Sequence, residues 1–121
     1  MNKDLKSKLK EKMGALVTDE QLEKVAGGTY EQNLEILVAM ANIDPENVQK
    51  VFSKINAEET NPRDIGFIIS QGAANLILKH FHMAVATSND LDNRYIDRDG
   101  SNLNQDQMLK MIKDKAAQNY L

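Results

Sequence analysis

The chain of 121 residues contains no cysteine and no tryptophan, and aromatic residues make up only 5% of it. Without cysteine, the chain has no disulfides, no lanthionine rings, no thiolate metal sites and no cysteine nucleophile. The scarcity of aromatic residues predicts an aliphatic core. The two prolines both lie at expected helix starts, and there are few glycines. These features favour helices over a sheet with many turns.

Long apolar runs are also missing from the sequence. No stretch offers 18 uninterrupted apolar residues, so we expect no membrane-spanning helix. Lys3 to Lys12 could serve as the charged region of a secretory signal peptide. However, the apolar run that follows, Met13 to Val17, is too short for such a signal. We therefore expect no signal peptide of this kind.

The net charge of −3 is unevenly distributed along the chain. Residues 1–28 carry six lysines against five acidic residues, whereas residues 29–121 carry nine basic residues against thirteen acidic ones. An acidic body argues against nucleic-acid binding. It also argues against the cationic attraction that draws many killing peptides to anionic membranes.

The stretch from Leu16 to Gly28, LVTDEQLEKVAGG, has the signals of a short helix with both ends specified. Thr18 and Gln21 have the spacing of a capping box, and Val17 and Leu22 that of a hydrophobic staple. Leu22 and Val25 share one helical face. The sequence therefore predicts an amphipathic helix that begins at Thr18.

Gly27 and Gly28 end this helix, because glycine adopts the left-handed C-cap conformation without steric cost. Two consecutive glycines also leave a stretch of backbone without side chains. Such a stretch fits a narrow protease channel.

This segment resembles the double-glycine leader of peptides exported by ABC transporters that carry their own cysteine-protease domain. The places of the leader pattern are held here by Val17, Thr18, Gln21, Leu22, Val25, Ala26, Gly27 and Gly28. The resemblance implies that Val17, Leu22 and Val25 dock in a groove of the protease. It also implies that cleavage falls between Gly28 and Thr29. It covers about the first 28 residues and nothing beyond them.

For residues 29–121 we predict an all-α fold, a small helical bundle, preceded by the amphipathic leader segment 1–28. Apolar periodicity indicates helices over 30–42, from Pro45 to about Ile55, and over 62–87. Residues 88–103 follow neither the helical nor the strand period and are expected to form a long loop. Asn104 and Gln107 then have capping-box spacing for a last helix. Its expected core-facing residues are Met108, Met111, Ile112, Ala116 and Tyr120.

The stretch 62–87 is expected to be the central helix of the bundle. Its apolar stripe includes Ile65, Ile69, Ala73, Leu76 and Ile77, and Phe67, Ala74 and Leu78 extend the apolar surface around the helix. A helix of this kind is normally surrounded by other helices. Gly66 and Gly72 either allow a close helix contact or mark a bend. The alternative is that the stretch inserts into a membrane, as in a pore-forming toxin.

Asp97, Asp99 and Asp106 give a weak resemblance to a calcium loop, at its third, fifth and twelfth places. Tyr95 takes the first place, where a carboxylate is needed, so an Asp-Gly turn is the preferred interpretation. His80 and His82 point to different sides of a helix and cannot share one metal ion. The sequence therefore predicts no metal site and no cofactor.

No catalytic residues are predicted either. Ser70 lies in a predicted helix without a glycine elbow, and no catalytic set can be singled out, so we do not expect an enzyme.

Two functions remain open at this point. In the first, the chain is a cytoplasmic precursor that a peptidase-containing ABC transporter exports and cuts after Gly28. The secreted product would then be a bacteriocin-like or signalling protein that acts on an unidentified target protein. In the second, the chain is a cytosolic helical interaction module, and residues 1–28 are integral to its fold.

Overall fold

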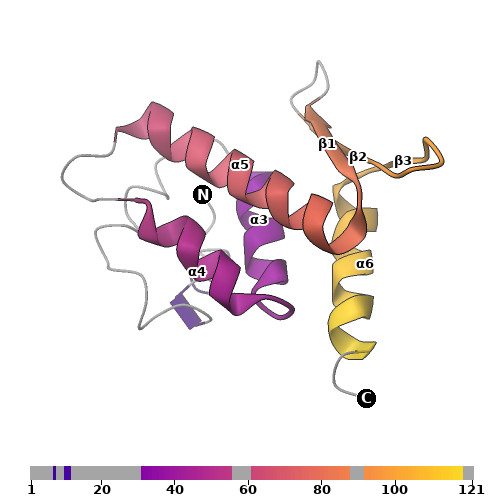
Figure 1. Cartoon of the computed structure of the whole chain (residues 1–121), viewed down its shortest axis with the longest axis horizontal. Helices are drawn as coiled ribbons and strands as arrows, with labels where there is room; N and C mark the ends of the chain where they lie inside the picture. Colours follow the sequence, from indigo (N-terminus) through magenta and orange to yellow (C-terminus); the bar gives the residue numbers. More distant parts are fainter. Residues whose placement is uncertain (1–6, 8–9, 12–30, 56–60, 88–91, 119–121) are drawn as a thin grey trace.

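The computed structural model describes residues 7, 10, 11, 31–55, 61–87 and 92–118, and the fold below is that of these residues. It is mostly helical, with a small antiparallel sheet between the last two helices (Figure 1). The elements in chain order are α3 (Glu31–Met40), α4 (Pro45–Ser53), α5 (Pro62–Phe81), β1 (Ala84–Thr87), β2 (Asn93–Ile96), β3 (Asn102–Leu103) and α6 (Gln105–Gln118).

Three helix starts predicted from capping residues are confirmed. The backbone N–H of Asn47 donates to Asp44 Oδ1 at 3.2 Å before α4. At the start of α5, the N–H of Asp64 donates to Asn61 Oδ1 at 2.9 Å. Both helices then have proline in their first turn, where no backbone donor is needed.

The third confirmed start is the capping box of α6. The N–H of Gln107 donates to Asn104 Oδ1, and the N–H of Asn104 donates to Gln107 Oε1, both at 2.9 Å. The sequence predicts a similar capping box from Thr29 and Gln32, but Thr29 lies outside the described residues. The side chain of Gln32 bonds to Asp92 and to the backbone of Asn93.

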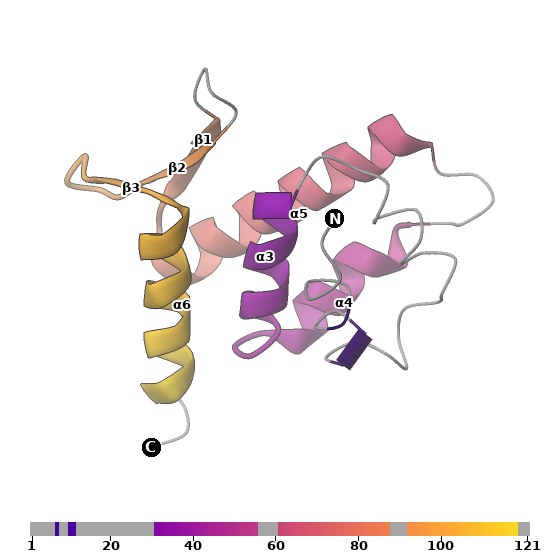
Figure 2. The same ribbon diagram turned by 180° about the vertical axis from the view of Figure 1, so that it is seen from behind.

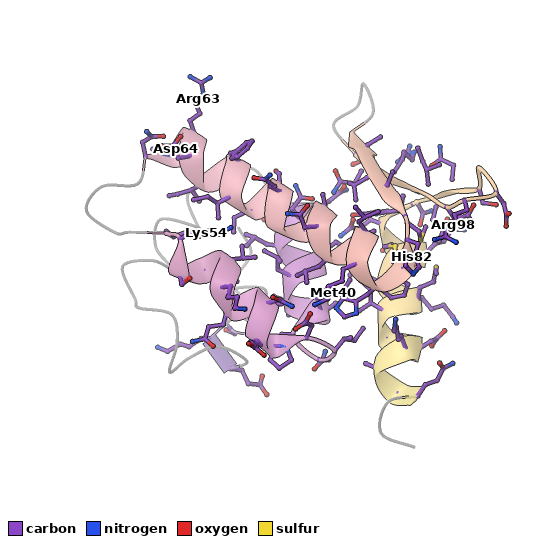
Figure 3. All side chains as sticks on the ribbon, in the orientation of Figure 1. Met40, Lys54, Arg63, Asp64, His82 and Arg98 are labelled. Atoms are coloured by element: carbon purple, nitrogen blue, oxygen red, sulfur yellow. The ribbon has the colours of Figure 1, made fainter. Side chains whose placement is uncertain are left out.

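Helix α3 packs against α4, α5 and α6, as the two opposite views show (Figures 1 and 2). Ile36, Leu37 and Met40 on this helix are completely buried. Met40 lies among the helices near the middle of the molecule (Figure 3). The core is aliphatic, as predicted, with Phe52 and Tyr95 as its fully buried aromatic side chains among the described residues.

The prediction of an all-α fold is correct only in its coarse form, because a three-stranded antiparallel sheet in the order β1–β2–β3 interrupts the helices. Ala84 pairs with Ile96, and Tyr95 pairs with Leu103. The described part of the predicted loop 88–103 therefore contains two strands. The predicted helix 62–87 ends at Phe81, where His82 adopts the left-handed conformation with φ 55° and caps the helix.

Helix α5 is also less enclosed than its apolar sequence predicts. Phe67 remains 65% exposed and Leu78 remains 58% exposed, so other helices do not surround this apolar surface as expected. In α6, Met108, Ile112 and Ala116 are buried, but Met111 is exposed, which contradicts its predicted core position. Tyr120 lies outside the described residues. The partial cover of α5 leaves an apolar surface beside α4.

Gly72 allows α4 to approach α5 closely. A Cβ atom at this position would lie 2.7 Å from both Cγ atoms of Val51 on α4. Of the two roles predicted for this glycine, the close helix contact is therefore the one observed.

Candidate functional site

The predicted leader residues Val17, Thr18, Gln21, Leu22, Val25, Gly27 and Gly28 all lie outside the described residues. Their docking and cleavage roles stay predictions. The described chain resumes at Glu31, where α3 begins, three residues after Gly28. The contacts made by the first turn of α3 therefore show how the new N-terminal region would be held after a cut at Gly28.

A polar network ties that first turn to the sheet. The Gln32 side chain accepts a hydrogen bond from the backbone N–H of Asn93 at 2.7 Å. Next to it, Asn93 Nδ2 donates to Asn33 Oδ1 at 2.8 Å and to the Tyr95 hydroxyl at 3.1 Å. Asn93 is only 4% exposed, so these partners offset the cost of burying its amide.

The same network reaches the start of α6 through Gln105. Its Nε2 donates to the backbone carbonyl of Gln32 at 2.9 Å, and its Oε1 accepts from the Tyr95 hydroxyl. Burial raises the pKa of Tyr95 to about 12, although the hydrogen bond from Asn93 opposes this shift. Tyr95 therefore stays neutral near pH 7. The network consists of amides and one phenol, with the Asp92 carboxylate accepting from Gln32 Nε2 at its exposed edge, and it holds α3, β2 and α6 together.

A second polar cluster surrounds Asp44, the N-cap of α4. Its Oδ2 lies 2.8 Å from His80 Nε2 and 3.4 Å from Lys79 Nζ, both at the end of α5. Partial burial opposes ionisation of Asp44. The hydrogen bonds from Asn47 and His80 outweigh this effect and hold the pKa of Asp44 well below its usual range. This cluster joins the start of α4 to the end of α5.

The three residues considered for calcium are divided between a turn and a helix. Asp97 Oδ1 accepts the backbone N–H groups of Asp99 and Ser101, both at 2.9 Å, in the turn between β2 and β3. Gly100 completes this turn with φ +82°, and Asp106 lies in the first turn of α6. Within the described ranges, no group of three or more His, Asp or Glu side chains is placed to hold a metal ion.

Ser70, considered above for catalysis, and His80 and His82, considered for a metal ion, lie on α5 or at its C-cap. Ser70 Oγ accepts a hydrogen bond from Asn33 Nδ2 at 3.0 Å on the exposed side of α5. His80 is engaged by Asp44, and His82 is exposed at the C-cap of α5. These contacts join elements of the fold to one another, and they do not bring a nucleophile together with a base.

A groove of about 440 Å³ runs between α4 and α5. Its apolar lining comes from Val51, Phe67, Ile68, Gly72 and Leu76. Its polar lining comes from Asn47, Lys50, Lys54, Gln71, Asn75 and Lys79. Among the described residues, this is the feature whose shape and charge suit it best to binding another molecule.

Neither the polar network nor the groove is predicted by the sequence. A period-2 signal exists in β2, where Asn93 and Tyr95 are buried while Arg94 and Ile96 are partly exposed. This strand was not predicted, because a segment of four residues that contains an asparagine has the composition of a loop. The groove combines two helices whose relative placement is set by Gly72 and Val51, and no local pattern contains that information.

None of the described helices is long and apolar enough to cross a membrane. Comparison of the chain with known protein families, curated proteins and solved structures gives no match.

Proposed function

We propose that the chain is the precursor of an exported protein with a double-glycine leader in residues 1–28. A peptidase-containing ABC transporter would cut between Gly28 and Thr29 and release residues 29–121 from the cell. The released part would act outside as a bacteriocin-like or signalling factor on a target protein, without catalysis of its own. The leader pattern from Val17 to Gly28 is the observation that carries this proposal.

The described core lies entirely on the C-terminal side of the proposed cut. The buried core residues of the described chain begin at Leu34 and end at Ala116. The polar network begins at Gln32, four residues after Gly28. Cleavage after Gly28 would therefore remove none of the residues that form this core and this network.

A cytosolic interaction module, with residues 1–28 integral to the fold, is the second candidate. It is favoured by the exposed apolar side chains of Phe67 and Leu78, which the rest of the molecule leaves largely in solvent. Phe67 also lines the apolar groove between α4 and α5, and contiguous exposed apolar surface often marks an interaction site. The two candidates differ in whether the first 28 residues are removed.

The first test is Gly28→Val in a host with a matching peptidase-transporter. Glycine has no Cβ, so valine would place a branched side chain where the protease must admit bare backbone. We expect the variant to stay uncut inside the cell. Gly14→Val, which changes a glycine outside the leader pattern, should be cut and exported normally. Normal cutting of Gly28→Val would refute the leader and favour the cytosolic module.

Leu22→Ala tests recognition by the protease. It removes an apolar side chain worth about 1.5–3 kcal/mol when fully buried, which corresponds to roughly a tenfold to hundredfold loss of affinity. Leu5→Ala is the matched control, because Leu5 lies in the leader but outside the pattern. Equal cleavage rates for the two variants would argue against a docking role for Leu22.

A further inference from the structure

The groove between α4 and α5 has an apolar floor that lies open to solvent. Gly72 on α5 lies in close contact with Val51 on α4. The side chains on either side of this contact leave a space open between the two helices, and this space is the groove. Phe67 lines it and is 65% exposed, a large fraction for a phenylalanine. Aromatic side chains, phenylalanine among them, are enriched in protein interfaces relative to the rest of the surface.

The charge around this floor has one sign. Lys50, Lys54 and Lys79 line the groove, and none of its described lining residues is acidic. This arrangement stands out in a chain of net charge −3. Lys54 lies at the end of α4 that faces the first half of α5 (Figure 3). The groove therefore presents positive charge around an apolar centre.

Two of these lysines also contact acidic residues outside the groove. Lys50 lies 3.6 Å from Glu46, and Lys79 lies 3.4 Å from Asp44. Both lysine side chains are well exposed, at 66% and 59%. The Lys50–Glu46 pair is exposed on both sides, and such pairs contribute little to stability. A carboxylate on a bound partner can therefore compete for Lys50 at small cost, whereas Lys79 also serves the partly buried Asp44.

The length of the groove indicates what fits it. Its lining on α5 runs from Phe67 to Lys79, which at about 1.5 Å per residue spans roughly 18 Å. An open hollow of this length, between two helices, matches a partner helix of about 12 residues more closely than a compact ligand enclosed on most sides. Binding an amphipathic helix by its apolar face is a recurring mode of protein recognition.

We propose that the α4–α5 groove binds an acidic amphipathic helix of a partner protein. The apolar face of that helix lies on Val51, Ile68 and Leu76 and packs against Phe67. Its flanking carboxylates pair with Lys50, Lys54 and Lys79. This interaction concerns the body of the chain and holds whether or not residues 1–28 are removed. Its failure in a binding assay is thus distinct from failure of leader cleavage.

The test uses the full-length chain and a displayed library of amphipathic helical peptides of about 15 residues, a length at which isolated helices begin to be stable. The library varies Leu, Ile, Phe and Met on the apolar face, and Glu, Gln and Lys at the flanking positions. We expect selection to enrich peptides with Glu at the flanks. No enrichment, or enrichment of Lys there, would overturn the proposal.

Selected peptides are then measured against two matched pairs of variants. Lys50→Glu with Lys54→Glu should weaken binding about tenfold or more, because it replaces attraction by repulsion at the flanks. Lys110→Glu with Lys113→Glu makes the same charge change on exposed positions of α6, where Lys110 has an (i, i+4) partner as Lys50 does. This second pair should leave affinity nearly unchanged.

The apolar contact is tested in the same way. Phe67→Ala should weaken binding about tenfold or more. Leu78→Ala removes a similarly exposed apolar side chain of α5 that does not line the groove, and it should have little effect. Circular dichroism melts of all variants verify that they fold. Equal losses in folded groove and control variants would overturn the proposal.

Other occupants would give different results, each of which also overturns the proposal. A second copy of the chain would give a dimer in sedimentation that Phe67→Ala dissociates. If the chain's own leader occupied the groove, peptides would bind only after Leu22→Ala with Val25→Ala, which removes the apolar side chains of the leader. An anionic membrane would give binding to phosphatidylserine vesicles that depends on Lys50 and Lys54, without peptide enrichment.

Discussion

Gly72 shows how one residue without a side chain sets the distance between two helices. Alanine at this position has the better helix propensity, by about 1 kcal/mol. However, its Cβ would lie 2.7 Å from two atoms of Val51, a branched side chain with little freedom to move away. The steric conflict outweighs the propensity, because overpacking costs about 1–3 kcal/mol.

We therefore expect Gly72→Ala to lower the free energy of unfolding by about 1–2 kcal/mol, measured by urea denaturation. In the background of Val51→Ala the two contacts at 2.7 Å are gone, and only the Cβ of residue 51, at 3.3 Å, stays close. There, the same substitution should be neutral or stabilising by up to about 1 kcal/mol. A gain in stability from Gly72→Ala in the unmodified chain would contradict the close contact.

Asp44 couples the start of α4 to the end of α5 through its charge. Its pKa in the folded chain lies below the ordinary value of 3.8, because the hydrogen bonds from Asn47 and His80 outweigh the effect of burial. The ionised group therefore stabilises the fold fully above the unfolded-state pKa. This stabilisation is lost as the pH falls from there towards the folded-state pKa.

Asp44→Asn keeps a capping side chain but removes the charge. We expect the variant to be less stable than the unmodified chain at pH 7, and the difference to shrink as the pH falls below about 4. Chemical denaturation at several pH values measures this difference. Asp114→Asn, in an exposed pair with Lys110, should have a small effect at every pH. A constant difference for Asp44→Asn would exclude the charge as its cause.

At the scale of elements, the helices were predictable and the strands were not. Asp44 with Pro45, Asn61 with Pro62, and Asn104 with Gln107 mark three helix starts that the structure confirms. These signals are local, so the sequence contains them fully. The strands β2 and β3 are short, and β2 also makes a hydrogen bond to Gln32, which lies far away in the chain.

The exposed apolar residues of α5 were mispredicted for a related reason. Periodicity indicates which residues share a face, but it does not indicate how many neighbours cover that face. Phe67 and Leu78 satisfy the apolar pattern and still remain exposed, because the described elements cover only part of α5. For the same reason, the groove could be recognised only in three dimensions. The leader pattern, by contrast, depends on sequence alone and stays a prediction.

The polar network offers a test at the element scale. Tyr95→Phe removes the hydroxyl that accepts from Asn93 and donates to Gln105. Because it leaves buried polar groups with fewer partners, we expect a loss of about 1–3 kcal/mol in the free energy of unfolding. Asn102→Ala, at an exposed position of β3, should change it by less than about 0.5 kcal/mol. Equal effects of the two substitutions would show that the network does not stabilise the sheet.

At the scale of the whole molecule, the account requires that residues 29–121 fold on their own. The described core residues all lie between Leu34 and Ala116. The account predicts that the isolated segment keeps its helical circular dichroism spectrum and a cooperative melt. Residues 29–103 lack α6, with the buried Met108, Ile112 and Ala116, and should not fold cooperatively. A molten or aggregated 29–121 would favour the view that residues 1–28 are integral to the fold.

The central claim is cleavage between Gly28 and Thr29, and the intact mass of the exported protein tests it most directly. The chain is expressed in a host with a matching peptidase-transporter, and the protein in the medium is measured by mass spectrometry. The account predicts a single species of residues 29–121, with Thr29 as its first residue. Full-length protein in the medium, or a cut at any other place, would contradict the account.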